Sequence, residues 1–335
     1  MKKILLTMTA LCLALALSAC GGVEAEEEKE PQASPTAAPA REETEAAQVP
    51  PLPQRLEFVD GTPVLQVYVT EDDEIRQMEL EEYVMGVLAG EMRADWPMEA
   101  MKAQAVLART FVLKFLSEKS SMYPGADIST DINEAQAYDA EAVNSRVEKA
   151  VSDTAGQVLS YKGEFPYAWF HSHAGGMTDY PTQALDFADE DPEYIRSVES
   201  PESDKAPTAV KSWKVTFSPE EVVKAAREAG ASVDALSSIA LGEKSQAGRS
   251  VTLLINGQEV SAPRFRVAVG STKLKSTLID SVALQDGRVT FEGRGFGHGV
   301  GLSQWGAYGM AENGADYREI IDHYFEGVDV VSLWN

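Results

Sequence analysis

Residues 80–118 read LEEYVMGVLAGEMRADWPMEAMKAQAVLARTFVLKFLSE, and this stretch predicts two consecutive helices. Apolar residues recur at helical spacing in its first part, so the first helix is expected over about 79–92. Trp96 and Pro97 interrupt the pattern, and proline suits the first turn of the helix that follows, which should end near Glu118. Two adjacent helices with a short break between them form a helical hairpin or corner.

Glu91 is the unusual residue of the first predicted helix. Helical spacing puts its carboxylate on the same stripe as the apolar residues Leu80, Val84, Val87 and Leu88. Burial raises the pKa of a carboxyl, which can then act as a general acid near neutral pH, as in the cleavage of glycosidic bonds. Alternatively, Glu91 ends the helix with its head group in water or pairs with a cation such as Arg109. The pattern alone leaves both readings open.

After the helix pair the chain changes to short β-type runs separated by turn residues. Residues 56–70 also alternate in polarity, which predicts a hairpin turning at Asp60 and Gly61. A single isolated helix with a capping box is expected within the later strands at 218–230, and a last helix at 316–327. The β-type runs are GQVLSY, FPYAWFHS, KVTF, SVTLLI, RFRVAV and RVTFEG.

This order of elements predicts an α+β fold, because the strands and helices do not alternate regularly. The N-terminal helix pair is expected to pack on short mixed or antiparallel strands. The length of the folded region, 56–335, is compatible with one large catalytic domain or with two lobes around a substrate cleft.

The first 55 residues predict export and tethering. Residues 1–20 have two lysines, an uncharged run and small residues before Cys20, which is the pattern of a secretory signal. The ending Leu-Ser-Ala-Cys resembles the bacterial lipobox, in which the cysteine is lipidated; an uncleaved membrane anchor is the alternative. Residues 21–55 are rich in Pro, Ala and Glu and are expected to form a disordered tether. Both readings put the folded region on the extracytoplasmic face of the membrane.

Composition excludes several classes of protein. The 335-residue chain has a formal net charge of −24, and no basic cluster is available for a nucleic-acid backbone. Its two cysteines are Cys12 and Cys20, so the folded region has no disulfide, no thiolate metal ligand and no cysteine nucleophile.

Glycine occupies every odd position of GRGFGHGVG, residues 293–301. The spacing does not fit the dinucleotide motif GxGxxG, and GxxxxGK[ST] is absent from the sequence. In an extended strand, a period of two puts all the glycines on one face, which would permit close backbone approach by a ligand or by another chain. Tight packing of the strand under the core is the alternative. Five glycines lose much conformational entropy on folding, and this cost favours a functional site.

The histidines and serines give weaker signals. His171 and His173 would face the same side of a strand, but without cysteine or an HExxH motif the signal for a metal is weak and hydrogen bonding is favoured. His323 lies in the last predicted helix and is expected to be structural. Ser303 lacks the second glycine of GxSxG, and the sequence contains no SxxK.

Three segments together resemble the stage II sporulation protein D family, and within it the sporulation branch rather than the amidase-enhancer branch. They are LEEYVMGVLAGEM…WPMEAMKAQAVLARTFVL (80–113), HSHAGGMT (171–178) and GRGFGHGVGLSQWGAYGMA (293–311). The resemblance implies a lytic transglycosylase that acts during engulfment in sporulation. Its implied substrate is peptidoglycan glycan strands whose stem peptides an amidase has already removed.

The resemblance also implies roles for individual residues. Glu91 would protonate the oxygen between N-acetylmuramic acid and N-acetylglucosamine, and the C6 hydroxyl of the muramic acid would then close a 1,6-anhydro ring. Arg109 would orient the acid or bind substrate. The other residues expected to bind substrate are Gln136, Tyr138, His171, Ser172, His298, Ser303 and Gln304.

The same comparison predicts what the site lacks and what the protein binds. Some family members bind zinc through Cys and His just before the matching Q-x-Y segment, whereas residues 127–138 here contain neither, so no metal or other cofactor is expected. The expected partners are glycan strands, a cell-wall amidase, other engulfment proteins and, through the N-terminal anchor, the membrane. A non-catalytic enhancer that binds glycan or an amidase is the rival reading; the acid on an apolar face favours an enzyme.

Overall fold

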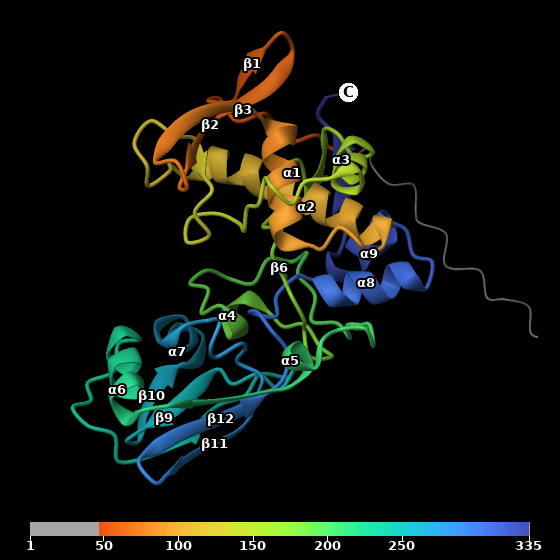
Figure 1. Ribbon diagram of the computed structural model, residues 1–335. Helices are drawn as coiled ribbons and strands as arrows, with labels where there is room; N and C mark the ends of the chain where they lie inside the picture. The colour runs from red at the N-terminus through yellow and green to blue at the C-terminus, as the bar shows by residue number, and fades with distance from the viewer. Residues whose placement is uncertain (1–46, 335) are drawn as a thin grey trace, which may run out of the picture. The chain divides into compact units, whose positions relative to one another are not determined.

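The computed structural model describes residues 47–334, so the predicted signal sequence, Cys20 and most of the predicted tether lie outside the described residues. Helices and several small sheets together form an α+β fold, as predicted (Figure 1). No helix within 47–334 is both long enough and apolar enough to cross a membrane. The helices are α1 (Leu80–Glu91), α2 (Met98–Glu118), α3 (Ser145–Ser152), α4 (Pro181–Ala184), α5 (Thr208–Lys211), α6 (Pro219–Glu228), α7 (Ala262–Val269), α8 (Gln304–Glu312) and α9 (Tyr317–Tyr324). The strands are β1 (Glu57–Val59), β2 (Thr62–Val69), β3 (Glu74–Glu79), β4 (Ile128–Ser129), β5 (Gln157–Ser160), β6 (Phe170–His171), β7 (Trp213–Phe217), β8 (Ile239–Leu241), β9 (Thr252–Ile255), β10 (Gln258–Ser261), β11 (Ile279–Gln285), β12 (Arg288–Gly293), β13 (Leu302–Ser303) and β14 (Asp329–Ser332).

The N-terminal sheet leads directly into the predicted helix pair. Strands β1, β2 and β3 are antiparallel neighbours, and β1 and β2 turn at Asp60 and Gly61, both with positive φ, as expected for the hairpin. β3 continues without a break into α1. The helix pair is confirmed: α1 ends at Glu91, and α2 begins directly after Pro97.

Helix α2 lies between two hydrophobic cores. Met101, Ala105 and Val112 pack in a core with α1 and β2, whereas Val106 and Leu107 pack in a second core with α8 and α9. A helix that is apolar on most sides must be buried, which explains the long apolar sequence of α2.

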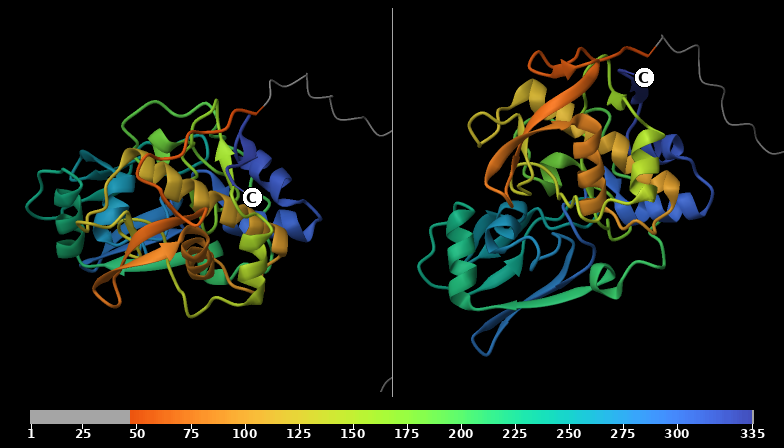
Figure 2. Two further views of the ribbon diagram at one scale, coloured as in Figure 1. Left: turned by 90° about the horizontal axis from the view of Figure 1, so that it is seen from above. Right: turned by 45° about the horizontal axis from the view of Figure 1, so that its top comes forward.

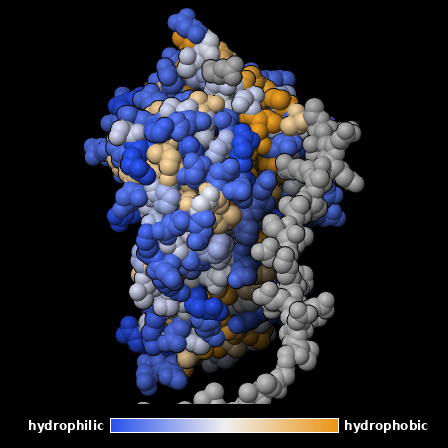
Figure 3. Space-filling view, turned by 90° about the vertical axis from the view of Figure 1, so that its right-hand side faces the viewer, coloured by the Kyte–Doolittle hydropathy of each residue, from blue (hydrophilic) through white to orange (hydrophobic). Residues whose placement is uncertain are grey.

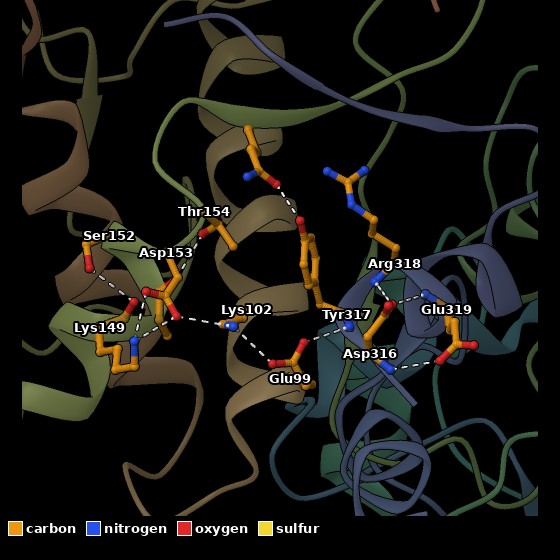
Figure 4. Close-up of polar contacts among 12 residues, drawn as sticks. Glu99, Lys102, Lys149, Ser152, Asp153, Thr154, Asp316, Tyr317, Arg318 and Glu319 are labelled. Atoms are coloured by element: carbon orange, nitrogen blue, oxygen red, sulfur yellow. Dashed lines mark hydrogen bonds and ion pairs between the residues drawn. The ribbon is translucent and has the colours of Figure 1, made fainter. Parts of the chain in front are cut away.

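Polar contacts tie the solvent side of α2 to its neighbours (Figure 4). Lys102 Nζ bonds Glu99 at 3.0 Å and Asp153, at the end of α3, at 3.2 Å. Glu99 in turn accepts a hydrogen bond from the Tyr317 backbone N–H, at the start of α9. These contacts hold α3 and α9 against α2. Helix α8, which packs with α9 in the second core, places residues of the candidate site described below.

Residues 213–293 build a third core from β7, β9–β12, α6 and α7, and these elements stay together in both views of Figure 2. Strands β11, β12 and β7 form one antiparallel sheet, and β10, β9 and β8 form another. Helix α6 has the predicted capping box between Ser218 and Glu221. The face of the molecule in Figure 3 is mainly hydrophilic, in keeping with the acidic composition.

The expected strand RFRVAV is wrong, because these residues belong to helix α7, and so the expectation of a single isolated helix in this region is also wrong. Ser261 accepts a hydrogen bond from the Arg264 N–H at the helix start, and Pro263 lies in the first turn. The start signals outweigh the β-branched composition because burial of Phe265 and Val269 in the third core stabilises the helix.

The glycine-rich segment is not the regular strand that its period of two suggested. β12 ends at Gly293, and the four later glycines all have positive φ, between 67° and 110°. A Cβ on Gly297 would lie 2.6 Å from the Cβ of His171, and one on Gly301 would lie 2.1 Å from the Trp169 carbonyl oxygen. Gly295, Gly297 and Gly301 therefore permit the close approach of residues 169–174 of the same chain, and Gly299 permits that of Arg249.

Candidate active site

A cavity of about 690 Å³ brings together residues that are far apart in the sequence. It is lined from α1, from the end of α2, from the loops around β4 and β6, from α7 and from the glycine-rich segment. Among its lining residues are most of the residues predicted for the site: Glu91, Gln136, His171, Ser172, His298 and Gln304.

Glu91 lies half-buried at this cavity, at the last position of α1. Burial raises the pKa of its carboxyl, and two hydrogen bonds oppose the rise. The Ala137 N–H donates to Oε1 at 2.9 Å, and Gln304 Nε2 donates to Oε2 at 3.3 Å. The backbone of Tyr138 approaches so closely that a Cβ on Gly90 would lie 2.7 Å from the Tyr138 nitrogen. Gly90 thus lets this segment reach the acid.

Several polar atoms of the cavity wall have no partner within residues 47–334. Gln136 is 4% exposed, and neither its amide nitrogen nor its amide oxygen makes a hydrogen bond. His171 is also 4% exposed; its Nδ1 lies 3.1 Å from the Val300 carbonyl oxygen, and its Nε2 has no partner. Buried polar groups are ordinarily hydrogen-bonded, so these atoms are exceptions for which a ligand or an ordered water would supply the partner.

The cavity histidines are neutral near pH 7. Burial lowers the pKa of His298 to about 3, helped by the nearby positive charges, and holds the pKa of His171 well below its usual range. The Val300 N–H donates to His298 Nδ1 at 3.1 Å, and the two rings lie 5.4 Å apart. Within the described part of the chain, no group of three or more His, Cys, Asp or Glu side chains could hold a metal ion. These imidazoles are suited to hydrogen bonding rather than to charge.

Aromatic rings form one wall of the cavity. Tyr167 and Trp169 are stacked with centroids 4.6 Å apart, and Phe187 meets both rings edge-on, at 5.6 and 5.3 Å. Lys114 Nζ lies 4.0 Å from the centroid of the Tyr167 ring. Such surfaces suit the apolar faces of sugar rings. Sequence reasoning identified FPYAWF only as a strand, although the aromatic alternation of Tyr167 and Trp169 was the available signal.

Three residues predicted for the site lie outside this cavity lining. Arg109 is fully buried, and its guanidinium makes a bidentate ion pair with Glu81 on α1, so the alternative pairing of Arg109 with Glu91 is wrong. Tyr138 stacks on Tyr83. Ser303 is the N-cap of α8, directly before Gln304.

Glu202 is another carboxyl that the structure buries and that the sequence did not reveal. Its side chain is 11% exposed, and it accepts hydrogen bonds from Ser303 Oγ at 2.9 Å and from the Ala174 N–H at 2.7 Å. His173 Nε2 lies 3.8 Å away. Burial raises the pKa of Glu202 to about 7, against these hydrogen bonds. The surrounding sequence, SVESPESDK, carries no periodic signal that marks one acid as buried.

Comparison with known proteins gives the family. The stage II sporulation protein D of Bacillus amyloliquefaciens is 32% identical over 281 residues, which cover 79% of this chain and 77% of the relative. The chain belongs to the stage II sporulation protein D family. The protein of the same name from Bacillus subtilis is 31% identical over 350 residues, 98% of this chain and 96% of the relative. The amidase enhancer of Bacillus subtilis is 28% identical over 296 residues, 74% of this chain but 40% of the relative.

Two family profiles match consecutive parts of this chain. A profile described as Stage II sporulation protein matches residues 68–161, and one described as a domain of unknown function matches 174–301. The sporulation protein D profile therefore covers Glu91 and Gln136, whereas His298 lies in the second profile. The cavity is lined from both regions of this family member.

Proposed function

We propose that this member of the stage II sporulation protein D family is a lytic transglycosylase that cleaves peptide-free glycan strands of peptidoglycan. The observation that carries the proposal is Glu91, a carboxyl with a raised pKa at an aromatic-lined cavity. Gln136 and His171, whose side chains carry polar atoms without a partner in the described chain, line the same cavity. A cavity that combines an apolar platform with a few polar groups is suited to an amphipathic sugar chain.

The proposed reaction needs one carboxyl group. Protonated Glu91 donates its proton to the oxygen between N-acetylmuramic acid and N-acetylglucosamine as the bond to C1 breaks. The C6 hydroxyl of the muramic acid attacks C1, and the Glu91 carboxylate accepts the hydroxyl proton. The products are a 1,6-anhydromuramic end and a free C4 hydroxyl, and Glu91 is protonated again. The hydrogen bonds from Ala137 and Gln304 stabilise the carboxylate during the step in which it is ionised.

The proposed setting is the extracytoplasmic face of the cell membrane, with lipidated Cys20 or an uncleaved N-terminal segment as the anchor. The proposed partners are the glycan strands themselves, a cell-wall amidase that removes the stem peptides first, and other proteins of engulfment. This role rests on the N-terminal sequence pattern and on the sporulation proteins among the relatives.

The test is digestion of peptide-free glycan strands by the purified protein, followed by mass spectrometry of the products. Anhydromuramic ends are expected from the wild type, and Glu91→Gln should abolish them while keeping the melting temperature. Glu82→Gln is the matched control, because Glu82 is an exposed acid on the same helix. Products with a reducing end would mean hydrolysis by water. No product from the folded wild type would refute the enzyme and favour a non-catalytic enhancer.

A further inference from the structure

Arg266, on α7, lines the same cavity as Glu91. Its guanidinium donates to two backbone carbonyls, from Nε to Lys275 at 3.1 Å and from Nη2 to Ser271 at 3.2 Å. None of the ion pairs formed among residues 47–334 includes Arg266. Burial lowers the pKa of Arg266 to about 10, so the group remains positively charged near neutral pH. The cavity therefore contains a cation without a carboxylate partner from the described chain.

The other two cations that line this cavity, and Arg109 in the nearby core, differ from Arg266. Lys114 is paired with Glu118 at 2.7 Å, and Lys119 is exposed to solvent. The fully buried Arg109 is neutralised by Glu81. A partly buried charge without a counter-ion is costly, and a chain with a formal net charge of −24 has many carboxylates that could have supplied one.

The groups closest to Arg266 supply no negative charge. His298, whose pKa the positive charge of Arg266 helps to lower, is neutral near pH 7. Arg249, which is fully buried and forms no ion pair within the described chain either, lowers the pKa of Arg266 further. No carboxylate is among the described groups that shift the pKa of Arg266, so an anionic group on the ligand could supply its counter-ion.

We propose that Arg266 binds the lactyl carboxylate of a muramic acid residue whose stem peptide has been removed, and so selects peptide-free glycan. This inference rests on the proposed function, because it takes glycan as the ligand. While the stem peptide is attached, the lactyl carbonyl belongs to a neutral amide. After the peptide is removed it becomes a carboxylate, and the planar guanidinium can bind both of its oxygens. The selectivity thus follows from one charge that appears when the peptide leaves.

The experiment measures binding rather than cleavage. The Glu91→Gln protein, which should bind strands without cutting them, is titrated with peptide-free strands and with the same strands after their lactyl carboxylates have been converted to primary amides. Loss of the carboxylate should weaken binding roughly ten- to hundredfold, the range for a hydrogen bond to a charged group. Arg266→Gln should weaken binding of the carboxylate strands by a similar factor and leave binding of the amidated strands unchanged. Lys224→Gln removes an equal charge from an exposed position on α6 and should change neither affinity.

Equal affinity of the Glu91→Gln protein for carboxylate and amidated strands would overturn the proposal. This comparison does not depend on whether the Arg266→Gln variant folds. Arg266→Lys, which keeps the charge and loses the planar fork, should bind carboxylate strands with intermediate affinity. The proposed function has a separate readout. Binding that depends on the carboxylate and on Arg266, without anhydromuramic products from the wild type, would refute the enzyme and support this site. If the wild type forms anhydromuramic products equally well from carboxylate and amidated strands, the enzyme is supported and the proposed role of Arg266 is refuted.

Discussion

The pairing of Arg109 with Glu81 makes a prediction that separates a structural from a catalytic role for this arginine. The Arg109 side chain is fully buried, and the Glu81 side chain is 19% exposed. Glu81 accepts from Arg109 Nε at 2.9 Å and from Nη2 at 2.6 Å, and it also accepts the Gly156 N–H at 3.0 Å. Arg109 Nη1 donates to the Gln157 carbonyl oxygen at 2.8 Å. The pair therefore joins α1, α2 and the start of β5.

The perturbation is Glu81→Gln, which removes the negative charge and leaves a buried guanidinium without a counter-ion. Breaking a buried pair in this way costs about 3–5 kcal/mol, a large part of the roughly 5–15 kcal/mol by which a folded protein is stable. The double variant Glu81→Leu, Arg109→Met removes both charges and with them the cost of burying an ion pair, and it loses the hydrogen bonds to the Gly156 N–H and to the Gln157 carbonyl oxygen. Replacing a buried ion pair by apolar residues of similar volume is often neutral or stabilising. The double variant should therefore be more stable than Glu81→Gln alone.

The assay is urea denaturation of each variant, with the free energy of unfolding taken by linear extrapolation. Asp95→Asn is the control, because the Arg93–Asp95 pair has side chains 77% and 66% exposed and should contribute under about 1 kcal/mol. A loss below about 1 kcal/mol for Glu81→Gln would refute the reasoning on the buried pair. A stable double variant that makes no anhydromuramic product would refute the structural role and return Arg109 to the site.

Three further predictions concern the carboxyls and the backbone around them. Gln304→Leu removes a hydrogen bond that stabilises ionised Glu91, so the pKa of Glu91 should rise and the alkaline limb of kcat should move to higher pH; an unmoved limb would mean that another group is the acid. Glu202 has a pKa of about 7 in the folded state against 4.5 ordinarily, so the folded state binds the extra proton between these values and the free energy of unfolding should fall as pH rises from about 4.5 to 7. Glu202→Gln should remove that part of the pH dependence in denaturation curves, and an unchanged profile would contradict the assignment. Gly90→Ala puts a Cβ 2.7 Å from the Tyr138 nitrogen, so it should lower the free energy of unfolding by about 1–3 kcal/mol in thermal denaturation and should also reduce activity. Full activity would show that the segment around Tyr138 can shift freely.

Local patterns predicted the elements whose signals lie within a few residues. The stripe that ends at Glu91 and the proline at position 97 suffice to place both helices of the pair. The run RFRVAV misled because its β-branched residues favour a strand, while the signals that start the helix, Ser261 and Pro263, lie just before it. A reading that began at the N-cap would have identified α7.

The site was predicted less completely because its contacts join distant parts of the chain. Gln304 lies 213 residues from Glu91, and no periodicity links the two positions. The glycine-rich segment was expected to admit a ligand or another chain, whereas the atoms that approach it most closely belong to residues 169–174 of the same chain, which no local pattern indicates. Arg266 was not predicted as a site residue, because the sequence does not show that this arginine lacks a carboxylate partner.

The start of α8 contacts two carboxyls with raised pKa values, Glu91 and Glu202, which need not share one role. Ser303, the N-cap, bonds Glu202, and the next residue, Gln304, bonds Glu91. Burial raises the pKa of both acids, so the pKa does not choose between them. Access to the cavity distinguishes the two acids, since Glu91 lines the cavity and Glu202 does not. Among the described lining residues the other carboxylate is Glu118, which is paired with Lys114 at 2.7 Å. A cavity with one desolvated acid is sufficient for ring closure by the sugar's own hydroxyl, whereas hydrolysis by the usual pair of carboxylates would require a second acid free to act.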